Sequence, residues 1–370
     1  MFNEWDIQAL RGVGNVELRF DPAKRVRVLF GSNGVGKTKC LEAIFQALLL
    51  GNKNFLHENG NHGYSLGWES MASVTADGRE IFKAQEEWVG LRNYSKNFAH
   101  ETPIVLIGAS GRSRMPVVDS RLELIGTFSD RKRNYFQSLF SAITGQSMTD
   151  IGMMANAQSW FVSRASSVNP YQKDTDSRSV EIEAVLQILH SIDGRIDSKQ
   201  LQIDGAGKVS LSIDGTYREL QQLSSGFASL IKLVQAIVSG YANFTNESNL
   251  TRVSGVVLID EIESHLHAEW QSKIVPILKS RLPNTTFYVA THSPIVLSQL
   301  EQGEAYLLRR EQDGVVRTSE IDSPNKRSFV DVLESGFNVD LNALKRESML
   351  VDDQSAAKTR LLDLLKGREG

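Results

Sequence analysis

The sequence has 370 residues, of which 41% are hydrophobic and 23% charged, as is typical of a globular protein with one large domain or two modest ones. Its net charge of -3 argues against a surface coated with positive charge, so any nucleic-acid contact requires a local basic patch. The single cysteine, Cys40, excludes an internal disulfide or a cysteine metal cluster within one chain, and we expect it to pack in a helix.

The first residues show no charged leader followed by an apolar core, and no run approaches the roughly 18 apolar residues that span a bilayer. This pattern argues against a transporter with a fused membrane domain. We therefore expect a cytoplasmic protein without a membrane partner.

Alternating apolar and polar residues over 6–30 predict a strand, a break at 11–14 and further strand ending in VRVLF. The next residues, 31–38, read GSNGVGKT, and the run 39–50 has the apolar spacing of a helix. We expect this helix to end at Gly51, because glycine readily forms a left-handed cap.

The segment GSNGVGKT matches the phosphate-binding loop pattern GxxxxGK[ST]. Its glycines would let backbone N–H groups point at phosphates, Lys37 would bind the β- and γ-phosphates of ATP, and Thr38 would give its hydroxyl to Mg²⁺. A glycine-rich turn before a helix is the alternative, but the predicted flanking strand and helix favour the loop. The predicted ATP contacts in this loop are Asn33, Gly34, Val35, Gly36, Lys37, Thr38 and Lys39.

Residues 52–200 are polar and rich in Ser, Asn and Gly, which predicts an inserted subdomain. Amphipathic spacing predicts helices at 129–144, 156–166 and 179–192, and a hairpin at 201–220 would return to the core. In the first helix, residues 131–133 (RKR) precede Tyr135 and Phe136, a mixture that is either a nucleic-acid contact or a solvated helix face.

The segment LSSGF, at 223–227, places Ser225 and Gly226 before the apolar run FASLIKLVQAIV. A hydroxyl and backbone N–H groups at a helix N-terminus suit an anion. Such a sequence is often only a helix cap, but its position between the other motifs favours a second ATP contact.

The apolar run VVLI predicts a buried parallel strand that ends in Asp260 and Glu261. Ligands of open α/β sheets bind at this edge, so Asp260 would hold Mg²⁺ and Glu261 would act as general base on the attacking water. A helix N-terminus enriched in acids is the alternative. Glu263 either charges the following helix or takes part in the site.

His292 follows a second apolar strand, YVAT, and precedes a Ser-Pro pair that would end it. Its imidazole is predicted to contact the γ-phosphate or the attacking water, which makes it a catalytic residue beside Glu261 and Lys37. His265 and His267 have no third ligand nearby in sequence, so a metal site is not expected there.

Together these segments resemble the ABC-type ATPases of the structural-maintenance, RecF and overcoming-lysogenization-defect (OLD) group, over about 1–51 and 201–308. The stretches IQALRGVGNVELRF, LSSGF, LIDEIESHLH and ATHSP are most similar to OLD-like ATPases of bacterial antiphage defence systems, the Septu-like kind. The resemblance implies an α/β fold: a P-loop ABC-type ATPase head (1–51 and 201–318), an inserted helical or mixed subdomain (52–200) and a short C-terminal helical tail (319–370).

The family resemblance also implies that two chains meet head to tail, with Ser225 and Gly226 of one chain contacting the γ-phosphate bound by Lys37 of the other. The segment after the core is too short for the Toprim nuclease domain of OLD nucleases, and the insertion lacks the heptad run of a coiled-coil arm. No glutamine is assigned to assist Mg²⁺, and Arg112 or Arg114 is a candidate nucleotide contact.

We therefore expect an ATPase that forms ADP and phosphate, dimerises or forms a larger homo-oligomer, and works with a separately encoded effector, a nuclease, in antiphage defence. The alternative is a RecF-like ATPase that binds DNA or DNA ends. A stand-alone nuclease is not expected, because no carboxylate cluster remains outside the nucleotide site.

Overall fold

The computed structural model describes residues 2–59, 70–84, 98–113, 115, 124–145, 148–153, 156–168, 171, 173 and 176–326. Arg114 and the predicted helix of the C-terminal tail lie outside the described residues.

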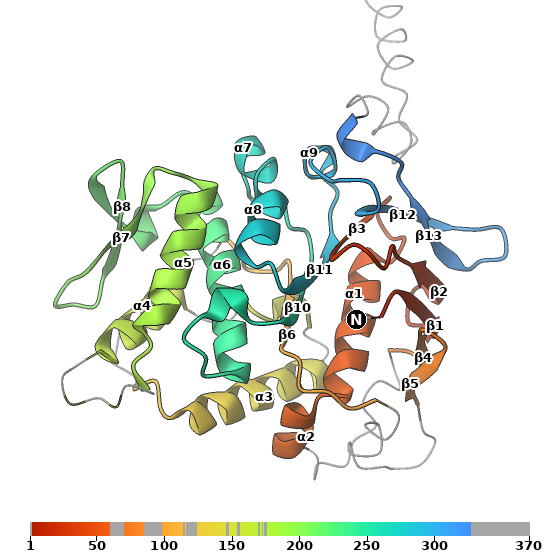
Figure 1. Ribbon diagram of the computed structural model, residues 1–370, viewed down its shortest axis with the longest axis horizontal. Helices are drawn as coiled ribbons and strands as arrows, with labels where there is room; N and C mark the ends of the chain where they lie inside the picture. Colours follow the sequence, from red (N-terminus) through yellow and green to blue (C-terminus); the bar gives the residue numbers. More distant parts are fainter. Residues whose placement is uncertain are drawn as a thin grey trace, which may run out of the picture.

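A ten-stranded sheet forms the centre of the molecule (Figure 1). Its order is β5 (Arg79–Lys83), β4 (Ser73–Ala76), β1 (Glu4–Leu10), β2 (Gly14–Arg19), β13 (Val316–Glu320), β12 (Ala305–Arg310), β3 (Val26–Phe30), β11 (Thr285–Ala290), β10 (Gly255–Ile259) and β6 (Ile104–Ile107). The five strands from β12 to β6 pair in parallel, whereas β5, β4, β1 and β2 form an antiparallel meander at the other edge. Parallel strands covered on both faces read as continuous apolar runs, which is why VRVLF and GVVLI are recognisable in the sequence.

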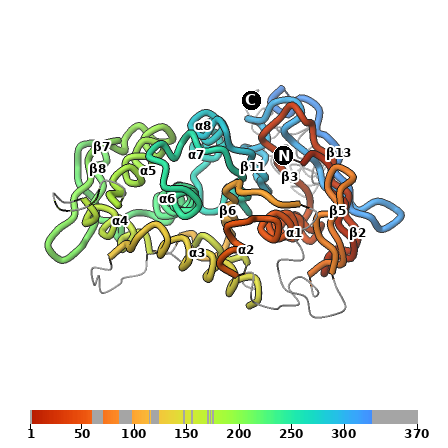
Figure 2. Tube along the Cα trace, turned by 60° about the horizontal axis from the view of Figure 1, so that its bottom comes forward, coloured from red at the N-terminus to blue at the C-terminus, as the bar shows by residue number. Residues whose placement is uncertain are grey.

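Helices cover both faces of the sheet, and alternate residues of each central strand enter separate cores. In β10, for example, Val257 and Ile259 face one core, and Val256 and Leu258 the other. The helices that bury side chains in the second core are α1 (Lys37–Leu50), α2 (Lys53–Asn59) and α3 (Phe128–Thr144), which lie along the lower side of Figure 2. The helices of the first core are α4 (Ala157–Ser166), α5 (Ser179–Ile192), α6 (Ser225–Phe244), α7 (Ala268–Gln271), α8 (Ile274–Arg281) and α9 (Pro294–Leu297).

Helix α6 is, by length and composition alone, apolar enough to cross a membrane, but 89% of its most apolar window is buried inside the molecule. Its apolar character is therefore explained by packing against α5, α4 and β6 in the core.

The predicted α/β class is confirmed, and the predicted strands around the phosphate loop and the three predicted helices of the insertion are present. The proposed boundary at residue 52 is wrong in one respect: β4, β5 and β6 come from 52–200 and join the main sheet. The predicted hairpin at 201–220 is part of a separate antiparallel sheet of β7 (Ile196–Ile203), β8 (Val209–Ile213) and β9 (Thr216–Glu219), so it does not return directly to the main sheet.

Gly51 follows α1 as predicted, but its backbone is right-handed, with φ of -88°. A Cβ at this position would lie 2.7 Å from the ring of Phe98 and 2.8 Å from the Phe98 carbonyl oxygen. Close packing, and not a left-handed cap, therefore explains this glycine.

Candidate functional site

The phosphate-binding loop connects the end of β3 to the start of α1, as the sequence predicts. A Cβ on Gly31 would lie 2.7 Å from the carbonyl oxygen of Leu308 in the neighbouring strand β12. Gly36 has a left-handed φ of 111°, and a Cβ there would lie 2.8 Å from the side chain of Val13. Both glycines are thus required by backbone shape, and the loop lies at the carboxyl end of a central parallel strand.

Lys37 is buried, and its ammonium group donates to the carbonyl oxygens of Gly31 (2.8 Å) and Ser32 (3.0 Å) in the same loop. Burial lowers the pKa of Lys37 to about 8, although Asp260 and the nearby glutamates act in the opposite direction. Within the described chain this ammonium makes no ion pair. A cation held by carbonyl groups in a glycine-rich loop fits an anionic phosphate ligand.

Thr38, in the first turn of α1, and Asp260, directly after β10, are brought together by the fold. The Thr38 hydroxyl donates to the Asp260 carboxylate at 2.9 and 3.1 Å from its two oxygens. Burial raises the pKa of Asp260 to about 6, and the Thr38 hydrogen bond opposes this shift. A hydroxyl and a carboxylate in contact are the oxygen donors that Mg²⁺ prefers when a phosphate completes its coordination, so these residues fit that ion.

Glu261 follows directly and has an exposed side chain on a left-handed backbone, with φ of 45°. A non-glycine residue with positive φ is uncommon and requires support from its surroundings. The Glu261 carbonyl accepts hydrogen bonds from the backbone N–H of Ser264 and from the guanidinium of Arg112. The carboxylate is therefore accessible to water at a fixed position beside Asp260, as a general base requires.

Arg112 is fully buried beneath the acidic pair. Its guanidinium donates to the carbonyl oxygens of Gly108 (2.9 Å), Asp260 (2.6 Å) and Glu261 (2.7 Å). The prediction of a direct nucleotide contact by Arg112 is therefore wrong: its donors hold the backbone that carries the carboxylates. Sequence reasoning missed this role, because it depends on a contact across 148 residues.

Glu263 holds the loop that carries His292. Its carboxylate accepts from the Thr291 hydroxyl (2.7 Å) and from the backbone N–H of His292 (2.6 Å). The following helix, α7, begins only at Ala268, so these contacts favour a role in the site over helix capping. Burial lowers the pKa of His292, and nearby Lys37 lowers it further, which favours a neutral imidazole close to the phosphate loop.

The LSSGF segment leads into α6, which begins at Ser225, two residues earlier than the sequence predicts. Ser224 is the N-cap, and its hydroxyl accepts from the N–H of Phe227. Ser225 is exposed, whereas Gly226 is buried, and a Cβ on Gly226 would lie 3.0 Å from the carbonyl oxygen of His265. In the described part of the chain, no hydrogen bond joins Ser225 or Gly226 to the phosphate loop of the same molecule.

Among the described residues, no group of three or more His, Cys, Asp or Glu side chains could hold a metal ion, and no glutamine hydrogen-bonds to Thr38 or Asp260. Cys40 is fully buried, as expected for a packing residue.

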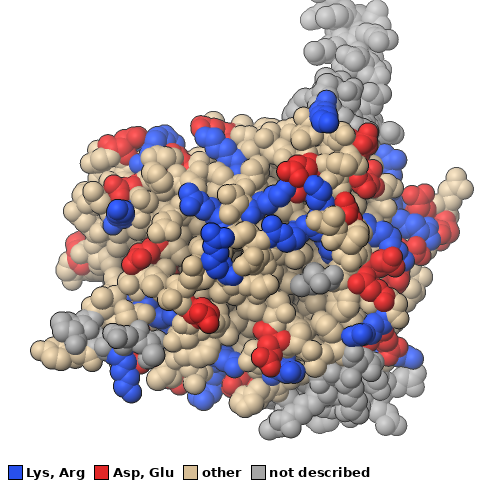
Figure 3. All heavy atoms as spheres, viewed as in Figure 1, with Lys and Arg blue, Asp and Glu red and all other residues tan. Residues whose placement is uncertain are grey.

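The predicted basic and aromatic DNA contact is also not a surface platform. Arg131 and Phe136 are buried, and the Tyr135 and Phe136 rings pack edge-on against Phe244. On the face seen in Figure 3, Lys and Arg side chains cross the middle with acidic side chains among them. Lys279 pairs with Glu301 and Glu304.

Lys37 and Thr38 after β3, the acidic pair after β10 and His292 after β11 thus stand at the carboxyl ends of adjacent parallel strands. This arrangement, with LSSGF at the start of a core helix, is the one expected for a P-loop ATPase of the ABC type.

Comparison with known proteins agrees with this class. The model of the family described as "AAA domain, putative AbiEii toxin, Type IV TA system" matches residues 155–298. The chain is 25% identical to the Septu protein PtuA of Bacillus mycoides (strain KBAB4), over 90% of this chain and 43% of that protein. It is 22% identical to the Septu protein PtuA of Bacillus thuringiensis, over 85% of this chain and 78% of that protein.

A shorter stretch, 25% of this chain and 17% of the relative, is 37% identical to the "Retron Ec83 probable ATPase" of Escherichia coli. The resemblance to Septu-like ATPases expected from the sequence is thereby confirmed. The chain spans less than half the length of the first of these relatives.

Proposed function

We propose that this chain binds ATP with Mg²⁺ and hydrolyses it to ADP and phosphate. The observation that carries the proposal is the contact of Thr38 with Asp260, beside an exposed Glu261 and a buried Lys37. Lys37 would bind the phosphates, and Thr38 and Asp260 would hold the metal ion, which supplies charge neutralisation when bound. Glu261 would accept the proton of the attacking water, and neutral His292 would orient that water or the γ-phosphate.

The proposed active form is a head-to-tail dimer in which Ser225 and Gly226 of one chain meet the nucleotide bound by the partner. Two features support it: Ser225 is exposed at the N-terminus of α6, where backbone N–H groups suit an anion, and it is not bonded to the phosphate loop of its own chain. ATP would then join two heads, and hydrolysis would release them.

We further propose that the ATPase works in the cytoplasm with a separately encoded effector, a nuclease, in defence against phage. The similarity to Septu proteins over most of this chain supports a Septu-type system, and the similarity to a retron ATPase points the same way. The RecF-like alternative needs a DNA-binding surface, and two of the residues of the candidate at 131–136, Arg131 and Phe136, are buried.

Light scattering with and without ATP and Mg²⁺ tests the dimer, together with phosphate release. Glu261→Gln should retain ATP and accumulate the dimer, Lys37→Ala should neither bind ATP nor dimerise, and Glu269→Gln, a change to an exposed carboxylate on α7, should behave as wild type. A Glu261→Gln protein that hydrolyses ATP at the wild-type rate would contradict the assigned base.

The biological part is tested separately by phage plating on cells that carry the native operon. Lys37→Ala should abolish protection, and a nuclease should co-purify with the wild-type chain. Full protection by the Lys37→Ala variant would reject the dependence of defence on ATP. Salt-dependent DNA binding by the isolated chain would instead favour the RecF-like function.

A further inference from the structure

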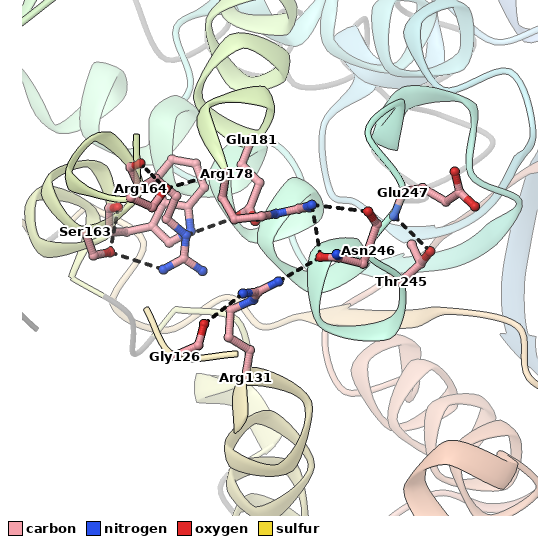
Figure 4. Close-up of polar contacts among 11 residues, drawn as sticks. Gly126, Arg131, Ser163, Arg164, Arg178, Glu181, Thr245, Asn246 and Glu247 are labelled. Carbon is pink, nitrogen blue, oxygen red and sulfur yellow. Dashed lines mark hydrogen bonds and ion pairs between the residues drawn. The ribbon is translucent and has the colours of Figure 1, made fainter. Parts of the chain in front are cut away.

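Three arginines meet in the interior on the side of the molecule formed by α3, α4 and α5. They are Arg131 on α3, Arg164 on α4 and Arg178 at the start of α5. Figure 4 shows the Arg131 and Arg164 side chains entering the same region from opposite sides, with Arg178 between Arg164 and Asn246. Arg131 and Arg178 are 5% and 2% exposed, so these charges are almost entirely removed from water.

The described residues supply too few acceptors for these guanidinium groups. Glu181 is fully buried, and its two carboxylate oxygens accept from the Nε atoms of Arg164 (3.0 Å) and Arg178 (2.7 Å). Arg131 and Arg178 both donate to the same oxygen, Oδ1 of Asn246, at 3.0 and 3.1 Å.

Two nitrogen atoms in the cluster, Nε of Arg131 and Nη2 of Arg178, are buried and have no hydrogen-bond partner among the residues that the structure describes. Among the described residues, the three arginines outnumber the acidic groups near them, which are Glu181 and the more distant Asp176; the charge of Asp176 acts to raise the pKa of Arg131. A buried charge without a partner is costly, so an anion at this position would stabilise the fold.

A cavity of about 570 Å³ opens beside the cluster, between α3, α4 and α6. Arg131 and Arg164 line it, together with apolar side chains such as Leu139 and with Trp160. The indole Nε1 of Trp160 is a further buried donor, and no described residue accepts a hydrogen bond from it. The unpartnered buried side-chain atoms of the cavity lining are thus N–H donors, which select a ligand rich in acceptors, and the volume suits a small molecule.

We propose that this cavity binds a phosphate group, either free or carried by a small molecule such as a nucleoside monophosphate, through Arg131 and Arg164, with the charge of Arg178 in the adjoining cluster adding to the positive potential. Guanidinium groups match phosphate oxygens in a bidentate manner, and the apolar lining would receive the remainder of a larger ligand. This site is distinct from the ATP site. Arg131 and Arg178 bond to Asn246, just beyond the C-terminus of α6, whereas Ser225 is at the opposite end of this 20-residue helix, about 30 Å away at 1.5 Å per residue.

The test uses the full chain carrying Lys37→Ala, so that the phosphate loop does not contribute to binding. Inorganic phosphate and AMP are titrated separately, with calorimetry for the Kd and thermal unfolding for the shift in Tm. We expect both probes to bind and to raise the Tm. A tighter Kd for AMP would assign the cavity to phosphorylated small molecules, and equal values would assign it to free phosphate.

Arg164→Gln should weaken binding at least about tenfold, because it removes a charged donor. Arg164→Lys keeps the charge but loses the planar fork and should fall between Arg164→Gln and the parent. The matched control is Arg133→Gln, which removes an exposed positive charge from α3 and should leave the Kd unchanged. Arg131 is more deeply buried, and an Arg131→Gln variant that does not fold would leave the decision to the two Arg164 variants. The Arg164 side chain is 12% exposed at the edge of the cluster.

Two results would overturn the proposal. One is a folded Lys37→Ala protein that binds neither phosphate nor AMP at millimolar concentration. The other is a set of Arg164 variants that lower the Tm of the ligand-free protein but keep the parent's ligand-dependent shift, since arginines that only tie helices together would give that pattern.

Discussion

Glu263→Ala should both destabilise the protein and impair hydrolysis. The substitution removes two hydrogen bonds from a carboxylate, to the Thr291 hydroxyl at 2.7 Å and to the His292 N–H at 2.6 Å. A hydrogen bond to a charged group contributes about 1.5–3 kcal/mol. Because Glu263 is partly exposed, the lower value applies to each bond, and the free energy of unfolding should fall by about 3 kcal/mol.

Glu263→Gln is the informative partner variant. Its amide oxygen can still accept from the His292 N–H, and its NH₂ group can donate to the Thr291 hydroxyl. The loss should therefore be only about 1 kcal/mol. Glu311→Ala, which removes an exposed carboxylate, serves as the control and should be neutral.

Urea unfolding without nucleotide measures the stability, and steady-state phosphate release measures the enzyme. In Glu263→Ala, kcat should fall more than KM for ATP rises, because Glu263 holds the His292 loop, whereas Lys37 is the residue proposed to bind the phosphates. Stability of Glu263→Ala within about 0.5 kcal/mol of wild type would refute the reasoning, since it would mean that the two bonds do not hold the loop.

Three further changes have defined outcomes. Arg112→Met should destabilise the protein by about 3–5 kcal/mol, because it removes three hydrogen bonds of a buried charge, two of them to the buried carbonyl groups of Gly108 and Asp260. Urea unfolding of Arg112→Met and Arg112→Lys beside wild type would measure the loss. Gly51→Ala should cost about 1–3 kcal/mol through the clash with Phe98, whereas Gly205→Ala, where nothing lies within 4 Å, should be nearly neutral; equal unfolding midpoints would contradict the packing explanation. Burial lowers the pKa of His100 below 6.5, so the unfolded chain binds the proton more readily and stability should fall as pH drops through this value. The difference in unfolding free energy between wild type and His100→Gln should narrow from pH 7.5 to pH 5. A constant difference would exclude His100 as the source of the loss of stability at low pH.

The central strands of the fold can be predicted from the sequence because they are buried on both faces. VRVLF, GVVLI and TTFYVA are fully buried and mostly apolar, and polar site residues follow each of them. By contrast, β4 and β5 are only four or five residues long and lie in a polar stretch, so pairing with each other and with β1 decides their conformation.

The candidate site shows the same division. Lys37, Thr38 and Asp260 can be predicted because each belongs to a local pattern next to an apolar strand. The partners of Glu263 and the role of Arg112 cannot, because their contacts join residues 28 and 148 positions apart in sequence. A local sequence pattern indicates which groups face a ligand, whereas the groups that hold them in place are set by tertiary contacts.

The turn after the acidic pair links the two halves of the proposed dimer contact. The Glu261 carbonyl accepts from the Ser264 N–H, and the Ser264 carbonyl accepts from the buried hydroxyl of Ser229 at 2.8 Å. Ser229 lies one turn into α6, whose first residue is Ser225. One short turn therefore joins Glu261, the proposed base, to the N-terminus of α6, which is proposed to contact the nucleotide of the partner chain. A displacement of either must pass through that turn, so closure of a dimer around ATP and the placement of Glu261 are expected to be coupled.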